Sequence, residues 1–206
     1  MKTLFLIDGG HGGIDPKSGR YVTAGKRSPK FDDGTVLFEG VNNRDNVERL
    51  LEEMERYNLD AIDIVNDWRD ISLKERSRRA NELSRTRNCV LLSLHSNGAG
   101  NGRDWYIAKG IDIFIYNGKV STNTTRFAAL LARELTLSLC SPTNGLTRWR
   151  GVKKRNFAIL RETNCPAVLI ECGFHTDKDE AKLILTDEFK DKLISSIVDA
   201  CVLYDN

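Results

Sequence analysis

Three short apolar runs in this sequence each end in a side chain that can bind a metal ion or transfer a proton. His11 follows the first run after the turn Asp8-Gly9-Gly10, His95 follows the second, and Glu171 follows the third. In an open sheet of parallel strands, ligands bind beyond the carboxyl ends of the strands. We therefore expect His11, His95 and Glu171 to face one crevice.

Each of these residues alone has an ordinary explanation, such as a surface histidine or a glutamate that caps a helix. Their coincidence at three strand ends favours a site. Two imidazoles do not complete a hydrolytic zinc site, which usually has three protein ligands and one open position. Glu39 is the favoured third ligand, because it follows Leu37-Phe38 and precedes an amphipathic segment. His175 is the rival, although a polar residue in a turn is its simpler interpretation.

The segments that must position these residues alternate between apolar runs and longer amphipathic ones. The pattern predicts strands at residues 3–7, 61–65, 89–94, 111–116 and 167–170, and helices at 44–57, 72–87, 125–139, 177–185 and 187–203. This alternation predicts a single α/β domain over residues 1–206, with a twisted, mostly parallel sheet and helices on both faces. The remaining long segments, 9–38, 97–110 and 141–156, are polar connections of the kind that often carries function.

Composition excludes several other classes of protein. The chain has 206 residues, with 31 Lys and Arg against 29 Asp and Glu, so nothing indicates a nucleic-acid partner. No apolar run is long enough to span a membrane, and the N-terminus lacks the apolar core of a secretory signal. Five scattered cysteines without a CxxC pair argue against a disulfide framework. We expect a monomer that is synthesised in the cytoplasm.

Four segments also match a known family in chain order. The run Ile7-Asp8-Gly9-Gly10-His11-Gly12-Gly13 is followed by Glu39 before Asn43, by Ser93-Leu94-His95-Ser96-Asn97, and by Pro166-Ala167-Val168-Leu169-Ile170-Glu171-Cys172-Gly173-Phe174. Together they resemble the zinc-dependent N-acetylmuramoyl-L-alanine amidases of the amidase-3 type, over almost the whole chain. The resemblance implies a largely parallel sheet flanked by helices.

The same resemblance implies a reaction and a role for each site residue. His11, Glu39 and His95 would hold one Zn²⁺ ion, and Glu171 would be the catalytic acid and base. The substrate would be peptidoglycan, cut at the amide between N-acetylmuramic acid and L-alanine of the stem peptide. His175 stands where the family usually has a residue such as leucine, so an altered ligand set stays open.

Finer features of the resemblance concern where the protein acts. The loop Ala24-Gly25-Lys26-Arg27-Ser28-Pro29, followed by Asp33-Gly34-Thr35, resembles lysin-like members from phages and prophages. With no secretory signal, such an endolysin would reach the cell wall only after release or export. No wall-binding module follows the domain, which leaves its targeting unexplained.

Several alternatives remain beside the amidase. One is a zinc peptidase or deacylase that uses the same site on another amide, and another is a non-catalytic wall-binding module. A module of that kind is expected to lack one of the four site residues, and all four are present. A serine hydrolase is disfavoured because no GxSxG elbow occurs. The glycine-rich turn at residues 9–13 fits neither a P-loop nor GxGxxG.

Two further assignments are open. Asp8 could orient the His11 imidazole, as carboxylates beside metal-bound histidines do, or it could be a turn residue at a strand end. The basic stretch Arg148, Arg150, Lys153, Lys154 and Arg155 could meet the carboxylates of stem peptides, with Trp149 packing on a sugar or peptide. Such a run of charges is more often a solvated face.

Overall fold

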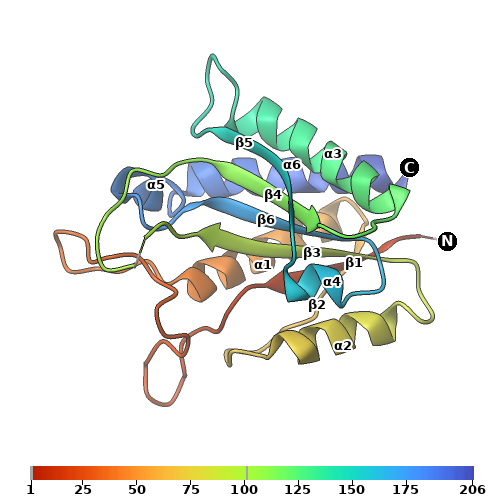
Figure 1. The fold of residues 1–206 in the computed structure, drawn as a ribbon, viewed down its shortest axis with the longest axis horizontal. Coiled ribbons are helices and arrows are strands. Elements are labelled where there is room, and N and C mark those ends of the chain that lie inside the picture. Colours follow the sequence, from red (N-terminus) through yellow and green to blue (C-terminus); the bar gives the residue numbers. More distant parts are fainter. Residues whose placement is uncertain (1, 101) are drawn as a thin grey trace.

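A six-stranded sheet forms the centre of the computed structural model, which describes residues 2–100 and 102–206 (Figure 1). Its strands are β1 (Leu4–Gly9), β2 (Asp60–Asp63), β3 (Cys89–Asn97), β4 (Ile111–Tyr116), β5 (Trp149–Arg155) and β6 (Ala167–Phe174). They lie side by side in the order β2-β1-β3-β6-β4-β5. All neighbours pair in parallel except β4 and β6, which are antiparallel. The mostly parallel sheet predicted from the sequence is confirmed.

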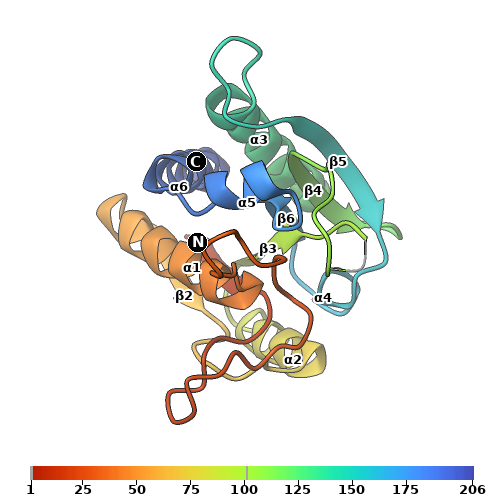
Figure 2. The same ribbon diagram turned by 90° about the vertical axis from the view of Figure 1, so that its left-hand side faces the viewer.

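Helices cover both faces of this sheet. They are α1 (Glu39–Arg56), α2 (Leu73–Leu83), α3 (Thr122–Leu139), α4 (Ala158–Arg161), α5 (Lys178–Leu183) and α6 (Asp187–Asp205). Figure 2 shows α1, α3 and α6 on one side of the sheet and α2 with α4 on the other. The chain is thus a single α/β domain with three layers. Among the described residues, no helix is long and apolar enough to cross a bilayer.

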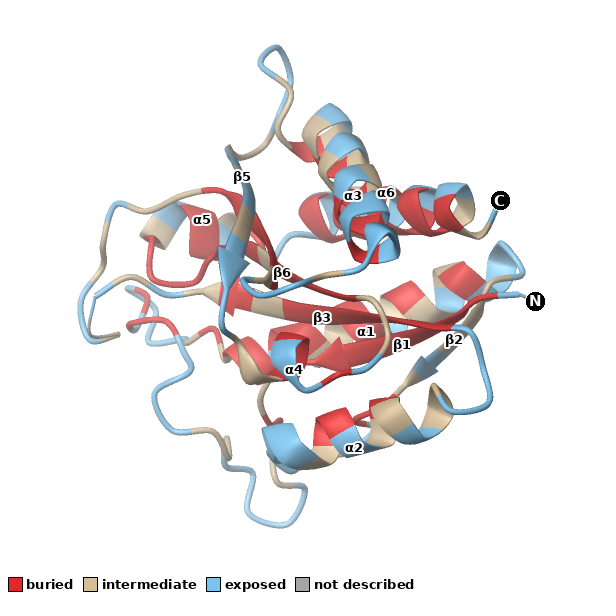
Figure 3. Cartoon of the chain, turned by 45° about the vertical axis from the view of Figure 1, so that its right-hand side comes forward, coloured by how far each residue is buried: buried red, intermediate tan, exposed pale blue. Residues whose placement is uncertain are grey.

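The apolar runs of the inner strands are continuous because both faces of the sheet pack into hydrophobic cores. In β1, Phe5 and Ile7 join the core under α1, α3 and α6, whereas Leu4 and Leu6 join the smaller core under α2 and α4. Successive side chains of a strand point to opposite faces, so a strand covered on both sides is apolar throughout. The central strands are accordingly buried along their length (Figure 3).

Strand β5 was missed by the sequence analysis, which took residues 141–156 for a connection. Its side chains alternate between partly buried and exposed, and it lies at one edge of the sheet. Edge strands are often charged, which protects their free side from pairing with other chains. A basic, half-exposed strand therefore carries none of the apolar signal by which the inner strands were recognised.

Two predicted strands and one predicted helix were also too short near the expected site residues. Strands β3 and β6 continue through His95 and Glu171 instead of ending before them. Helix α1 begins at Glu39, five residues before the expected start at residue 44. Glu39, His95 and Glu171 in these extensions line a cavity rather than a core, so the hydrophobic pattern ends before the hydrogen-bonded element does.

One arginine of α2 lies in the interior of the domain. The Arg76 side chain is 2% exposed and donates to Asp8 Oδ1 at 2.7 Å, Gly9 O at 2.8 Å and His11 O at 2.9 Å. The other carboxylate oxygen of Asp8 accepts a hydrogen bond from Ser93 Oγ at 2.6 Å. A buried charge is tolerated when it is paired and hydrogen-bonded, as here. Arg76 therefore joins α2 to the end of β1.

We predict that Arg76→Met destabilises the fold strongly. It leaves Asp8 buried and unpaired, a change that typically costs about 3–5 kcal/mol. The melting temperature should fall by roughly 6–20 °C, measurable by calorimetry of the metal-free protein. Arg78→Met, on the exposed face of the same helix, is the matched control and should melt close to wild type. Equal melting temperatures for the two variants would contradict this role of Arg76.

Candidate metal centre and active site

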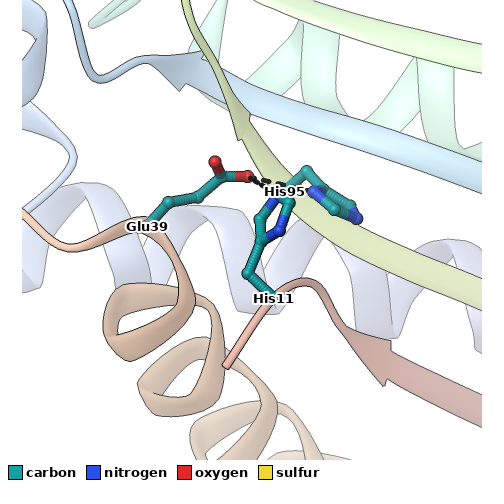
Figure 4. A group of neighbouring side chains, drawn as sticks. All are labelled: His11, Glu39 and His95. Atoms are coloured by element: carbon teal, nitrogen blue, oxygen red, sulfur yellow. Dashed lines mark hydrogen bonds and ion pairs between the residues drawn. The ribbon is translucent and has the colours of Figure 1, made fainter. Parts of the chain in front are cut away.

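Two histidines and a glutamate from three different segments converge at the carboxyl ends of β1 and β3 (Figure 4). His11 lies in the turn after β1, Glu39 is the first residue of α1, and His95 lies in β3. Glu39 Oε1 is 3.0 Å from His95 Nδ1 and 3.3 Å from His11 Nε2. The two imidazole rings meet edge to face, with centroids 4.9 Å apart. The predicted ligand residues are therefore brought together.

The spacing of these groups fits a zinc ion. One ligand atom from each residue lies within 4.8 Å of the other two. Zinc bonds of about 2.0–2.2 Å place neighbouring ligand atoms roughly 3.3–3.6 Å apart in a tetrahedron. The two measured separations are close to this range. A donor set of two imidazoles and one carboxylate also matches that of hydrolytic zinc enzymes.

The turn that carries His11 has an unusual backbone. His11 has φ of +64°, in the left-handed region that non-glycine residues seldom adopt. Its carbonyl oxygen accepts hydrogen bonds from two guanidinium groups, Arg44 Nη2 at 2.8 Å and Arg76 Nη2 at 2.9 Å. These charged donors offset the backbone strain. They also fix the direction in which the imidazole leaves the turn.

Glycines allow the turn to approach its neighbours closely. A Cβ atom at Gly10 would lie 2.1 Å from His95 Cε1, and one at Gly40 would lie 1.9 Å from the carbonyl oxygen of Gly12. Neither position has room for any side chain. The glycine-rich run therefore allows the turn to pack closely against His95 and α1.

The charge of Glu39 is set by its two imidazole neighbours. Burial opposes ionisation of this carboxyl, but hydrogen bonds with His11 and His95 hold its pKa well below the usual range. Burial likewise disfavours the charged form of His95, yet the adjacent Glu39 raises the pKa of that imidazole. The cluster therefore holds a negative charge between two bases, an arrangement suited to a divalent cation.

Glu171 lies beside this cluster but has a different environment. It is the neighbour of His95 across the β3–β6 pair, so both side chains reach the same end of the sheet. Burial raises the pKa of Glu171 to about 7. Its Oε2 atom is buried and makes no hydrogen bond with the described residues. A carboxyl group with this pKa can both accept and return a proton near neutral pH.

His175, the rival ligand, lies in the turn after β6 and is buried. Its Nδ1 atom is 3.0 Å from both Ser96 O and Ser96 Oγ, and 4.0 Å from Glu39 Oε2. Burial lowers the pKa of this imidazole, which favours its neutral form. Because Ser96 and Glu39 approach the same ring nitrogen, these three residues do not form a serine-hydrolase triad, whose base uses both nitrogens.

A cavity of about 590 Å³ opens over the cluster. Its walls include His11, Glu39, His95 and Glu171, together with His175. The cavity is large enough for a segment of a polymeric substrate. All four residues that the sequence analysis assigned to the site therefore share one accessible space.

The structure bears on the two open assignments, Asp8 and the basic stretch, in different ways. The carboxylate oxygens of Asp8 accept hydrogen bonds from Arg76 and Ser93, and Arg76 in turn donates to the His11 carbonyl oxygen. Within the basic stretch, Arg150 and Lys153 form ion pairs with the buried Asp112. No residue of the stretch is among the described residues that line the cavity. A role of the stretch in binding stem peptides stays a prediction.

Arg44 and Arg76 are the functional residues that the sequence analysis missed. Both donate to the His11 carbonyl, yet each lies in a segment that reads as a charged helix face. The sequence Arg76-Ser77-Arg78-Arg79 contains three arginines, of which Arg76 alone is buried. Only the side on which α2 meets the sheet distinguishes Arg76 from its neighbours.

Comparison with known proteins gives a consistent result. The amidase-3 family, described as N-acetylmuramoyl-L-alanine amidase, matches residues 5–202. The uncharacterized protein YqiI of Bacillus subtilis (strain 168) is 27% identical over 203 residues, which cover 98% of this chain and 84% of that protein. The N-acetylmuramoyl-L-alanine amidase LytC of the same organism is also 27% identical, but the chain spans only 35% of its length.

Solved structures agree with the fold. An N-acetylmuramoyl-L-alanine amidase from Clostridium difficile 630 superposes with a TM-score of 0.79 at 28% identity, covering 98% of this chain and 96% of that one. The catalytic domain of the CD27L endolysin, which targets the same species, superposes with a TM-score of 0.63 at 21% identity, covering 96% of each chain. The second likeness concerns the fold alone. The match over residues 5–202 and the convergence of His11, Glu39 and His95 lead to one conclusion: this chain belongs to the amidase-3 family of N-acetylmuramoyl-L-alanine amidases.

Proposed function

We propose that this chain hydrolyses the amide bond between N-acetylmuramic acid and L-alanine in peptidoglycan, with zinc held by His11, Glu39 and His95. The observation that carries the proposal is the convergence of these three ligands beside Glu171 in one cavity. Family membership supports the substrate. A zinc ion held there would act as a Lewis acid, which would acidify a water molecule and polarise the amide carbonyl.

The chain's own residues supply the proton transfers. Glu171 takes a proton from the attacking water and delivers it to the nitrogen of the departing amine. Its raised pKa suits both steps, because neither the protonated nor the ionised form is strongly favoured near pH 7. Glu39 stays ionised, since two imidazoles hold its pKa low, and it therefore acts as a ligand rather than as a proton donor.

We also propose that the chain acts as a monomeric endolysin-like enzyme that reaches the wall after release or export. The support for the endolysin-like role is the loop at residues 24–29, which resembles lysin-like members of the family.

The competing activity is that of a zinc peptidase or deacylase on another amide. Product analysis separates the two, because only the amidase frees the amino group of L-alanine and leaves the glycan intact.

We predict that Glu171→Gln retains zinc and loses turnover. The amide side chain cannot carry the proton, so the rate of peptidoglycan hydrolysis should fall by about 10²–10⁴-fold. Zinc content, turbidity loss and freed L-alanine amino groups are measured together. Glu162→Gln, an exposed residue outside the cavity, is the control and should behave as wild type. Wild-type protein without zinc or hydrolysis, or an active Glu171→Gln, would remove the proposal.

We predict that Gly10→Ala abolishes zinc binding. The added methyl group would occupy the position of the His95 ring and displace a ligand. Zinc affinity, measured by competition with a chelating dye, should fall by more than about 100-fold. Gly9→Ala is the control at the adjacent position, because the nearest atom to its methyl group would be Val47 Cγ2 at 3.2 Å, in a side chain that is not a metal ligand. Similar zinc affinities for both variants would contradict the steric argument.

We predict a pH-dependent penalty from Glu171 in the metal-free protein. The pKa of Glu171 is about 7 in the fold, against 4.5 for the ordinary group. Between these values the folded state keeps a proton that the unfolded state has lost, so the free energy of unfolding falls as pH rises. In urea unfolding experiments, the free energy of unfolding of Glu171→Gln should exceed that of wild type by a difference that grows from pH 5 to pH 8. We expect this difference to reach roughly 1–3 kcal/mol. A margin that does not change with pH would contradict the raised pKa.

A further inference from the structure

The two walls of the active-site cavity differ in chemistry. One wall is apolar and is formed by Leu73, Phe157, Ile159 and Leu169. The other is formed by residues 97–100 and by the loop at residues 24–26. A substrate that joins a sugar to a peptide likewise has two unlike ends.

Lys26 stands on this second wall. It is exposed, and it is the only lysine or arginine among the described residues that line the cavity. Its ammonium group forms no ion pair within the described part of the chain. Its charge nevertheless acts on the site, because it opposes the burial that raises the pKa of Glu171. An unpaired cation at the rim of a catalytic cavity is available to a substrate anion.

The backbone under Lys26 is fixed to the metal centre. The Lys26 carbonyl oxygen accepts a hydrogen bond from Glu39 N at 3.0 Å. The following residues pair with the segment before α1, since Ser28 N donates to Leu37 O at 2.8 Å and Ser28 Oγ accepts from Leu37 N at 2.9 Å. The lysine therefore starts from a defined position next to a metal ligand, although its side chain can move.

From this placement we propose that Lys26 is a specificity-determining residue that binds a free carboxylate on the peptide part of the substrate. The inference rests on the proposed function and deepens it. An ammonium–carboxylate hydrogen bond is stronger than one to a neutral amide. The enzyme then prefers peptides with a free carboxylate over peptides in which that group is a carboxamide. Glu39 Oε1 is engaged by His11 and His95, and no ion pair joins Glu39 to Lys26 in the described part of the chain.

The test compares two synthetic muramoyl peptides that differ only in a carboxylate or carboxamide on the residue after L-alanine. For the wild-type zinc enzyme we expect a KM about 5–20-fold lower for the carboxylate. Lys26→Gln should bring the ratio of the two KM values to about one, and Lys26→Arg should retain most of the preference. Lys17→Gln is the matched control, since Lys17 is an exposed lysine of the same long loop outside the cavity. It should keep the wild-type ratio.

Four results would overturn the inference. If wild type hydrolyses both peptides with equal KM, or if Lys26→Gln keeps the preference, Lys26 does not read the carboxylate, and the proposed amidase function still stands. If Lys26→Gln slows both peptides equally and shifts the pH profile of kcat, Lys26 acts through Glu171 instead. If wild type cleaves neither peptide and does not clear peptidoglycan, the proposed function fails and the inference fails with it.

Discussion

Both the fold and the site depend on the ion pair and the hydrogen bonds that the buried Arg76 guanidinium makes. It pairs with Asp8 at the end of β1, and its second nitrogen holds the carbonyl oxygen of His11. One side chain therefore attaches α2 to the central sheet and keeps the His11 turn in its left-handed conformation. Because the same group serves both purposes, stability and ligand geometry are coupled in this domain. Loss of Arg76 would remove the contact between α2 and the end of β1 and, at the same time, a hydrogen bond that holds the His11 turn.

The second constraint is the contrast between two carboxyl groups that share one cavity. Glu39 sits between two imidazoles, which stabilise its ionised form, whereas Glu171 has a buried oxygen without a hydrogen-bond partner. Burial alone would protonate both groups, so the difference comes from their partners. This difference is consistent with the roles proposed for the two residues. The ionised group is suited to bind a cation, and the group with a pKa near 7 is suited to move a proton.

The sequence analysis found the site because of how parallel sheets are built. Apolar strands covered on both faces are easy to recognise, and the residue after each strand marks the edge where ligands bind, which was enough for His11, His95 and Glu171. Strand β5 and the start of α1 were missed because their polar residues carry no apolar period. Arg76 was missed for a different reason. Its burial depends on how α2 is turned toward the sheet, and the neighbouring arginines have the same local signal.

His175 shows how backbone placement limits the number of ligands. An imidazole close to two histidines and a glutamate could complete a closed, four-ligand zinc site, which would be structural rather than catalytic. The turn after β6 instead directs Nδ1 of His175 toward Ser96, and 4.0 Å separates it from the nearer Glu39 oxygen. Its lowered pKa keeps it neutral, so it adds no positive charge beside the cation site. Among the described residues, the ligand atoms that converge are those of His11, Glu39 and His95, without His175. A set of three such ligands would leave the fourth position of a hydrolytic zinc site to water.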